Sequence, residues 1–190
     1  MALIIEALQP RDLPLFKAHF ARHVAESGDN NFHFMPFSPS DSDEPKGLDS
    51  ASLNIPIGTQ GWQRWFVAFN EARTVIVGHV DLKGDFLKTG LHRCELGIGI
   101  EAGYRDQGLG KRLLCKAIDL CRETESLDWL DLKVFRHNNN AIALYLSFGF
   151  SEVGTLVDRF RIDGVSVEDV IMTLSVTGPI LNAQKKGNST

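Results

Sequence analysis

The segment from Tyr104 to Lys111 has residues suited to binding a phosphate group, and it lies between an apolar strand pattern and an amphipathic helix pattern. Because glycine has no Cβ, Gly108 and Gly110 allow the backbone to approach an anion closely. The first turn of a helix also presents unpaired N–H groups and the positive end of the helix dipole. The segment therefore predicts a pyrophosphate site; the alternative is that the two glycines only begin the helix tightly.

Two other nucleotide-binding motifs do not fit the spacing. A Walker loop requires Gly-Lys followed by Ser or Thr, whereas Arg112 follows this dipeptide here. A dinucleotide fingerprint can be placed on residues 97–102, but the glycines there alternate with apolar residues inside a strand pattern, and no helix begins at that point. We therefore treat the second match as chance.

The arrangement Arg105-x-x-Gly108-x-Gly110 after an apolar strand resembles the coenzyme A pyrophosphate loop of the GNAT N-acetyltransferase superfamily. A second block is similar to the later helix motif of that superfamily at the expected spacing, and it consists of Asn138, Ala141, Tyr145, Gly149 and Phe150. Two motifs in the right order make the resemblance much more specific than either one alone. By element order the resemblance covers residues 65–175.

The resemblance implies an α/β chain with the GNAT fold. We expect a mixed, mostly antiparallel sheet of about seven strands with a V-shaped split, and helices on both of its faces. It also implies that acetyl-coenzyme A lies in the split, between strands that end near Ile100 and Phe135. The expected coenzyme A contacts are Ile98, Ile100, Arg105, Gln107, Gly108, Leu109, Gly110, Lys111, Asn138 and Ala141. Asn138 is also expected to cap its helix, because Asn is a favoured cap residue.

Direct attack of an amine on a thioester requires an amide donor for the oxyanion, a proton source and a route for the amine proton, but no covalent nucleophile. Tyr145 matches the family position whose phenol protonates the departing sulfur, and the alternative is a core tyrosine. Glu95 is the candidate base, with a surface ion pair as its alternative. Four further residues compete with Glu95 for this role: His79, Asp81, His92 and Asp131.

The cysteines favour neither a disulfide framework nor a metal site. Cys94, Cys115 and Cys121 form an odd set without a Cys-x-x-Cys pair, which is typical of reduced thiols, and we expect no metal. Cys94 follows His92 by two residues, which leaves a cysteine nucleophile as an alternative, but residues two apart on a strand merely share a face and need not form a catalytic pair.

Composition and charge predict one soluble domain over residues 1–176. The 190 residues are 43% hydrophobic and 23% charged, which suits a single core. A net charge of -4 argues against coating nucleic acid or an anionic membrane. No apolar run reaches the roughly 20 residues that a bilayer span needs, so we expect a cytoplasmic protein.

The patterns predict strands and helices in alternation, with a long insertion at residues 28–60 and a flexible tail at 177–190. We expect strands at 2–8, 65–69, 74–80, 94–100, 129–135, 151–162 and 166–175, and helices after Pro10, from Leu109 and over 138–148. Leu13, Phe16, Phe20 and Val24 would form the buried face of the first helix. Asp163-Gly164 predicts a hairpin turn.

The predicted function is transfer of an acetyl group from acetyl-coenzyme A to a primary amine on a small molecule or a protein N-terminus. The alternative is a non-catalytic module that senses acyl-coenzyme A and regulates a partner, for which an acid at Tyr145 would be unnecessary. No motif identifies the acceptor, and a homodimer is a possibility by analogy alone.

Overall fold

The computed structural model describes residues 3–29, 32–37 and 51–177. Residues 30–31 and 38–50 of the predicted insertion, and the tail from 178 onward, fall outside the described residues. The strands are β1 (Ile4–Ala7), β2 (Gln63–Phe69), β3 (Ile76–Gly84), β4 (Arg93–Ile100), β5 (Trp129–Phe135), β6 (Ser151–Ile162) and β7 (Val165–Ser175). The α-helices are α1 (Leu13–Ala25), α2 (Leu109–Glu123) and α3 (Asn139–Ser147). Short 3-10 turns occupy Pro10–Asp12, Ser52–Asn54, Lys88–Gly90 and Ala102–Tyr104.

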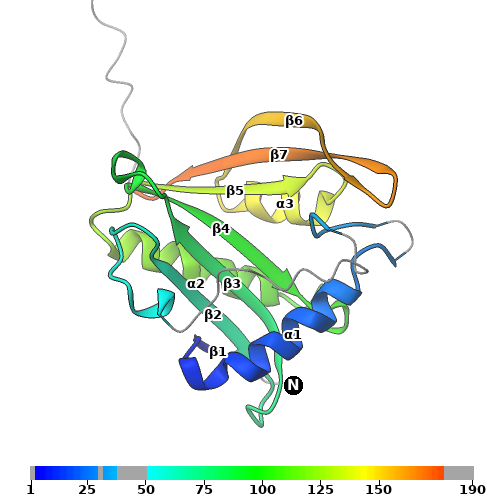
Figure 1. The fold of residues 1–190 in the computed structure, drawn as a ribbon, viewed down its shortest axis with the longest axis horizontal. Coiled ribbons are helices and arrows are strands. Elements are labelled where there is room, and N and C mark those ends of the chain that lie inside the picture. Colours follow the sequence, from blue (N-terminus) through cyan, green and yellow to red (C-terminus); the bar gives the residue numbers. More distant parts are fainter. Residues whose placement is uncertain (1–2, 30–31, 38–50, 178–190) are drawn as a thin grey trace, which may run out of the picture.

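The seven strands form one sheet in the order β1-β2-β3-β4-β5-β7-β6. Neighbouring strands are antiparallel except for β4 and β5, which are parallel. The β4–β5 pairing ends at Leu96 and Leu132, although β4 continues to Ile100 and β5 to Phe135. The sheet therefore divides into two arms that diverge from this point, which confirms the predicted V-shaped split (Figure 1).

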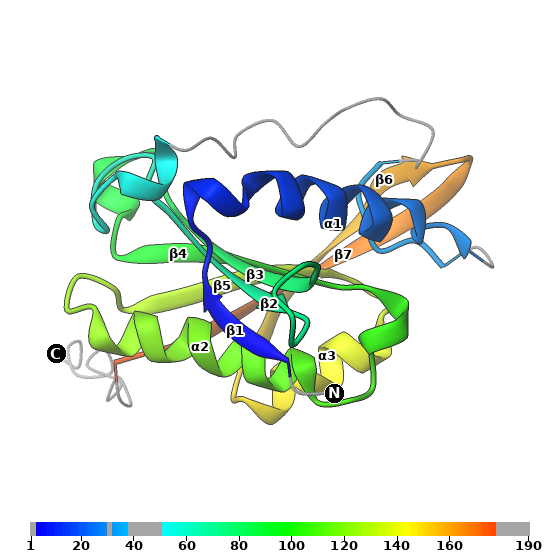
Figure 2. The same ribbon diagram turned by 90° about the horizontal axis from the view of Figure 1, so that it is seen from below.

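Helices cover both faces of the sheet, as predicted. Helix α1 lies on one face, and α2 and α3 lie on the opposite face (Figure 2). The helical pattern predicted from Leu109 onward is confirmed, because its apolar positions are buried against the strands; they are Leu109, Leu113, Leu114, Ala117, Ile118 and Cys121. Burial of each large aliphatic side chain contributes about 1.5–3 kcal/mol, so this face fixes α2 on the sheet.

The buried face of α1 differs from the predicted one. Its buried residues are Phe16, His19 and His23, while Val24 is only half-buried. His19 lies on the sheet side because polar partners meet it there, as described below, and the His23 ring stacks on the His19 ring. An apolar pattern could not have indicated this, since it counts histidine as a surface residue.

Strand β3 starts two residues later than predicted and runs four residues further. The Asn70 side chain accepts hydrogen bonds from the backbone N–H groups of Thr74 and Val75, which keeps both residues in the turn. At the other end, Lys83 pairs in register with Gln63 and with Glu95, so the strand extends to Gly84. The remaining strands lie within two residues of their predicted bounds.

Candidate active site

The open part of the V exposes one edge of β4. Residues 97–100 of β4 pair with β3 on one side and have no β5 partner on the other. Ile98 and Ile100 are half-buried and pack against the main core on the α2 side. Their backbone therefore lies along the split, where the family resemblance predicts acetyl-coenzyme A, and their side chains hold this edge in place.

The glycine loop leads directly into α2. Gly108 is the N-cap residue and has φ +76°, a left-handed conformation that favours glycine, and a Cβ built there would meet no atom within 4 Å. The first helical hydrogen bond runs from Arg112 N–H to the Gly108 carbonyl at 3.2 Å. The N–H groups before Arg112 belong to the first turn, where helices leave donors available to an anion.

Gly110 has a different reason to be glycine. A Cβ on Gly110 would lie 3.3 Å from Cδ2 of Leu144 and 3.4 Å from Cδ1 of Ile100. These contacts are tight, so the missing side chain lets the first turn of α2 pack closely against α3 and β4. The two glycines of the motif thus serve backbone conformation at Gly108 and packing at Gly110.

The Arg105 side chain ties the loop to neighbouring elements. Its guanidinium donates to the Ile100 carbonyl at 2.9 Å and to Glu26 at 2.6 Å, and it lies 4.8 Å from the Phe34 ring centroid. With these partners, Arg105 fixes the loop relative to the end of β4 and the end of α1.

The other polar side chains of the loop also have distinct environments. Gln107 donates to the Gly103 carbonyl at 2.9 Å, and Arg112 donates to the Leu3 carbonyl at 2.8 Å. Lys111 remains exposed. Lys111 is therefore the cation of α2 that is most available to reach a bound phosphate group.

The chain after α1 connects the two arms of the V at its open end (Figure 1). On the β4 side, the Phe34 ring lies 4.8 Å from His23 and packs on Arg105. On the β5 side, His137 Nε2 lies 2.6 Å from the His33 carbonyl, and the Phe32 ring lies 5.0 Å from His137. This short stretch of the predicted insertion thus borders the split.

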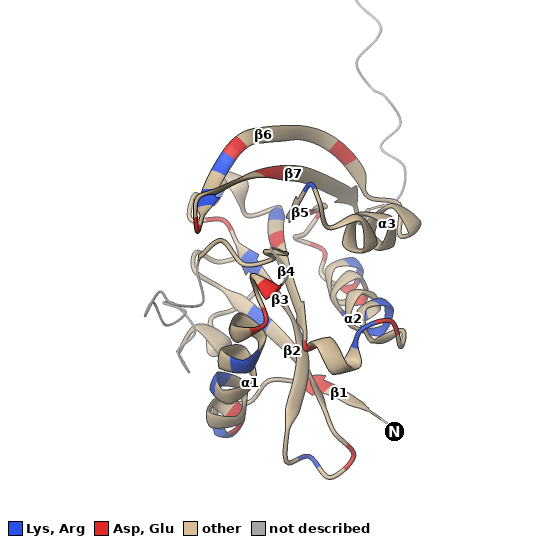
Figure 3. Ribbon diagram, turned by 90° about the vertical axis from the view of Figure 1, so that its right-hand side faces the viewer, with Lys and Arg blue, Asp and Glu red and all other residues tan. Residues whose placement is uncertain are grey.

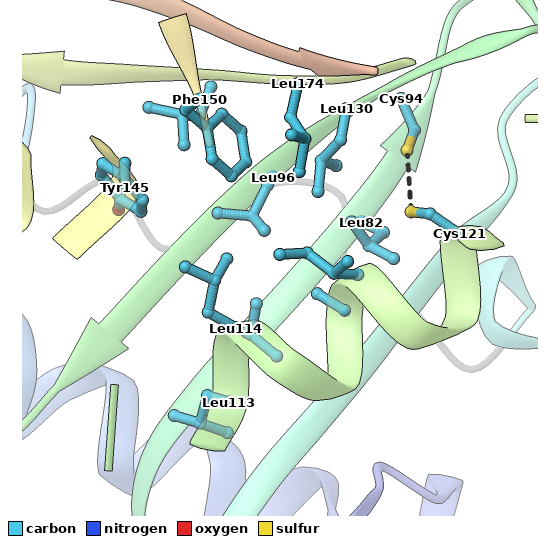
Figure 4. Close-up of a cluster of buried hydrophobic side chains, with 14 of the residues drawn as sticks. Leu82, Cys94, Leu96, Leu113, Leu114, Cys121, Leu130, Tyr145, Phe150 and Leu174 are labelled. Carbon is cyan, nitrogen blue, oxygen red and sulfur yellow. Dashed lines mark hydrogen bonds between the residues drawn. The ribbon is translucent and has the colours of Figure 1, made fainter. Parts of the chain in front are cut away.

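Tyr145 lies on α3 with its ring in the core beside Phe150, at a centroid distance of 5.7 Å (Figure 4). Its face of the helix also carries Ala141 and Phe148, which pack against the same core, as predicted. Burial raises the pKa of the phenol, so it stays protonated at neutral pH. Among the described residues its hydroxyl has no hydrogen-bond partner. A tyrosine retained only for packing would ordinarily satisfy this group.

Asn138 caps α3 as predicted. Its side-chain oxygen accepts a hydrogen bond from Ala141 N–H at 3.3 Å. The cap fixes the start of the helix that carries Tyr145.

Glu95 lies on the α1 face of the sheet and forms an ion pair with Lys133 at 2.5 Å. Its side chain is 55% exposed, and it lies in the part of β4 that still pairs with β5. Among the competing residues, Asp131 is bound by Arg93 and Thr173, and His92 is exposed just before β4, at the closed end of the V. Figure 3 shows acidic and basic segments interspersed along these central strands.

Asp81 and His79 on β3 are buried on the same face, and each lies across a glycine of β4. Asp81 pairs in register with Gly97, and His79 pairs with Gly99. A Cβ at either glycine would collide with the side chain of its partner. These glycines therefore belong to strand packing, which agrees with our rejection of a dinucleotide motif there.

Burial raises the pKa of Asp81, opposed by Lys83, whose Nζ lies 3.1 Å from the carboxylate. The carboxylate thus sits in an environment that favours its neutral form, beside a single cation that favours its charged form.

Behind His79 lies a polar cluster that the sequence did not reveal. His19 on α1 lies 2.7 Å from Glu101 through Nδ1 and 2.9 Å from His79 through Nε2. Arg22 donates to the same Glu101 carboxylate at 2.9 Å. The available signal was the pair His19 and His23, spaced by one helical turn on the side of α1 that carries Phe16 and Phe20.

Cys94 and Cys121 are free buried thiols whose sulfurs lie 3.7 Å apart (Figure 4). The contact with Cys121 and burial raise the pKa of Cys94. Cys94 is thus a neutral packing residue, and a thiolate nucleophile at this position is not supported.

Within the described ranges, no group of three or more His, Cys, Asp or Glu residues is placed to hold a metal ion. In the same ranges, no helix has the length and apolar character required to cross a bilayer.

Comparison with known proteins gives a consistent family. The L-amino acid N-acetyltransferase AaaT of Escherichia coli (strain K12) is 28% identical over 80 residues, which cover 42% of this chain and 49% of that protein. The N-alpha-acetyltransferase RimI of Mycobacterium tuberculosis is 36% identical over 67 residues, covering 35% of this chain and 40% of that protein. These alignments thus span half or less of the two relatives.

The solved structure of yncA, a putative acetyltransferase from Salmonella typhimurium with its cofactor acetyl-CoA, has a TM-score of 0.74 to this fold. The two chains are 16% identical, and the superposition covers 97% of this chain and 100% of the other. At this identity the likeness shows the fold alone. Residues 31–150 match the sequence profile of the acetyltransferase (GNAT) family, which is more than half of the chain. The protein is therefore a member of the acetyltransferase (GNAT) family.

Proposed function

We propose that this protein is an N-acetyltransferase that moves the acetyl group of acetyl-coenzyme A to a primary amine by direct attack. The observation that carries the proposal is the end of β4–β5 pairing at Leu96 and Leu132, which leaves residues 97–100 without a β5 partner along the split. A pantetheine arm contains amide groups, so it can add to such an edge in the way a strand does. The acetyl-coenzyme A bound to the similar Salmonella protein supports this donor.

The residues present fit that donor. The first-turn amides of α2, from Gln107 to Lys111, would hold the pyrophosphate, with Gly108 supplying the left-handed conformation that begins the helix. Lys111 is exposed and would add a charge-assisted contact. Ile98 and Ile100 would supply backbone groups to the arm, and Asn138 and Ala141 would border it from the start of α3. Arg105 would act indirectly, by fixing the loop.

Tyr145 would supply the proton to the departing sulfur. The phenol is protonated at neutral pH and its hydroxyl has no competing partner among the described residues. The amine nitrogen forms a bond to the acetyl carbon, the carbon–sulfur bond breaks, and the Tyr145 proton goes to sulfur. The amine proton must go to a base, for which Glu95 is the sequence-based candidate.

The two relatives are named an L-amino acid N-acetyltransferase and an N-alpha-acetyltransferase. Both names support α-amines as the acceptor class to test first.

The decisive experiment measures release of free thiol from acetyl-coenzyme A in the presence of amino acids, peptides with free N-termini and polyamines. Binding of acetyl-coenzyme A is measured in parallel by calorimetry. Amine-dependent release, with acetylated product identified by mass spectrometry, is the expected result. Tight binding without release for any amine would contradict the proposal and favour a sensor of acyl-coenzyme A.

A further inference from the structure

A row of buried polar side chains reaches from the end of β4 to the open part of the V. Glu101 lies 2.7 Å from Nδ1 of His19, and Nε2 of His19 lies 2.9 Å from Nδ1 of His79. His19 is fully buried and His79 is 5% exposed. Arg22 holds the Glu101 carboxylate through both Nε and Nη2. Side chains from α1 and β3 and a residue just after β4 thus form one connected set.

The hydrogen-bond chemistry of this set fixes the tautomers of the two rings. A carboxylate only accepts hydrogen bonds, so Nδ1 of His19 must carry a hydrogen and donate it to Glu101. In the neutral ring Nε2 of His19 is then an acceptor, and it takes the hydrogen of His79 Nδ1. This leaves the lone pair of His79 on Nε2, which has no hydrogen-bond partner among the described residues.

The His79 ring lies where β4 has left β5. His79 pairs with Gly99 of β4. Gly99 lies beyond Leu96, which is the last residue of β4 that pairs with β5. A Cβ on Gly99 would collide with Cε1 of His79 and lie 2.7 Å from Nε2 of His23. The imidazole thus contacts the strand segment along which the thioester is proposed to lie. Glu95, in contrast, lies in the paired part of β4 and is bound by Lys133.

We propose that His79 is the base that takes the amine proton, and that His19 and Glu101 are positioning residues that fix its tautomer. The inference rests on the proposed function and changes one part of it, the base, which becomes His79 instead of Glu95. As the amine bonds to the acetyl carbon, its N–H bond breaks and an N–H bond forms at Nε2 of His79. The imidazolium is stabilised through His19 by the Glu101 carboxylate, and it returns the proton to solvent after the product leaves.

The surroundings of His79 keep the ring neutral before the reaction. The titratable and charged groups that face it are His19 and His23 on α1, Asp81 and Lys83 on β3, and Glu101 after β4. Burial, together with His19, His23 and Lys83, holds the pKa of His79 well below its usual value. A weak base suffices here, because an amine nitrogen that has bonded to the carbonyl carbon is far more acidic than a free ammonium group.

The tautomer is tested first, because it can be observed in the wild-type chain without the acceptor amine. Nitrogen-15 NMR of the full chain at pH 7, with each ring assigned by its loss in a His→Gln variant, should show hydrogen on Nδ1 and a lone pair on Nε2 for His79. The same tautomer is expected for His19. If Nε2 of His79 carried the hydrogen, the base would have no lone pair toward the site and the proposal would be overturned.

Kinetics test the role. Glu101→Gln keeps the size of the side chain but removes its charge, so we expect kcat to fall at least about tenfold while KM for the amine and the affinity for acetyl-coenzyme A change less than about twofold. His79→Gln should lower kcat by about 100-fold or more. His92→Gln removes an exposed histidine before β4 and is the matched control, with wild-type kcat expected.

Each contrary outcome has a distinct meaning. Wild-type kcat in both Glu101→Gln and His79→Gln, with folding confirmed by thermal melting, would overturn the proposed base while leaving acetyl transfer intact. A large loss in Glu95→Gln alone would assign the base to Glu95. Absence of amine-dependent turnover in the wild-type chain, despite bound acetyl-coenzyme A, would overturn the acetyltransferase proposal and the base together.

Discussion

Asp81 on β3 and Gly97 on β4 are cross-strand partners, and the Asp81 carboxylate occupies the space that a side chain at position 97 would need. The same relationship holds two pairs further along, on the same face of the sheet, for His79 and Gly99. Two glycines in a strand ordinarily weaken it, because they add no packing and lose backbone entropy on folding. Here they make room for two ionisable side chains against the strand at the point where the V opens.

This packing predicts a steric effect at position 97. Gly97→Ala should displace Asp81 and lower the free energy of unfolding by about 1–3 kcal/mol, as overpacking of a well-filled site does. Urea unfolding at pH 7.5 measures the change. Gly154→Ala in β6 is the matched control, because a Cβ there meets nothing within 4 Å, and its free energy of unfolding should stay near wild type. Equal effects of both substitutions would argue against a specific collision with Asp81.

Gly108→Val should lower the affinity for acetyl-coenzyme A by more than about tenfold. A branched side chain at φ +76° is strained, and it would project where a phosphate must approach the first turn of α2. Gly164→Val separates the two causes, since Gly164 has φ +81° and open space around its Cβ position but lies in the β6–β7 turn. Calorimetry should show wild-type affinity for the Gly164 variant. Unchanged affinity in the Gly108 variant would rule out the loop as the pyrophosphate site.

Tyr145→Phe should lower kcat by about 100-fold while leaving the affinity for acetyl-coenzyme A unchanged. The hydroxyl has no partner among the described residues, so its removal should change the free energy of unfolding by less than about 1 kcal/mol. Because burial raises the pKa of Tyr145, the wild-type rate should show no loss from phenol ionisation up to about pH 10. Turnover of the variant at the wild-type rate would assign the acid elsewhere.

The buried histidines predict that the fold loses stability in mild acid. Burial, with help from the nearby His19 and Arg105, lowers the pKa of His23 to about 3. As the pH falls through 6.5, His23 is protonated in the unfolded chain but stays neutral in the folded chain. The free energy of unfolding therefore has its full value above pH 6.5 and falls as the pH drops below it. The pKa values of His19 and His79 are lowered as well, which adds to the effect.

Urea unfolding between pH 7.5 and pH 5 measures this dependence, with a limiting slope of about 1.4 kcal/mol per pH unit for each such histidine. His23→Gln should reduce the slope, and the exposed His92→Gln should not. Asp81 acts in the opposite sense, because its raised pKa means that the folded chain takes up this proton before the unfolded chain does as the pH falls. Identical slopes for all three proteins would contradict the assignment of acid lability to the buried cluster.

Much of the architecture followed from local patterns. The period of the apolar residues in α2, the Asp163-Gly164 turn and the Asn138 cap depend on neighbours in the chain, and each was confirmed. The β3 boundaries were missed, because the Asn70 side chain holds the turn at one end and cross-strand pairing extends the strand at the other. These contacts involve residues outside the strand, so the apolar pattern of the strand itself does not identify them.

The sequence alone determined the family resemblance, the glycine loop before α2 and the place of Tyr145 on α3, since these rest on residue types at fixed short spacing. Tertiary structure decided which ionisable groups meet. In the sequence, His19 is 60 residues from His79 and 82 residues from Glu101. The three side chains come together only because α1 packs on β3 beside the end of β4. The sheet register likewise placed Glu95 beside Lys133, and His79 over Gly99 in the open V. Burial and long-range contact set the charge and tautomer of these groups, and neither is encoded in local spacing.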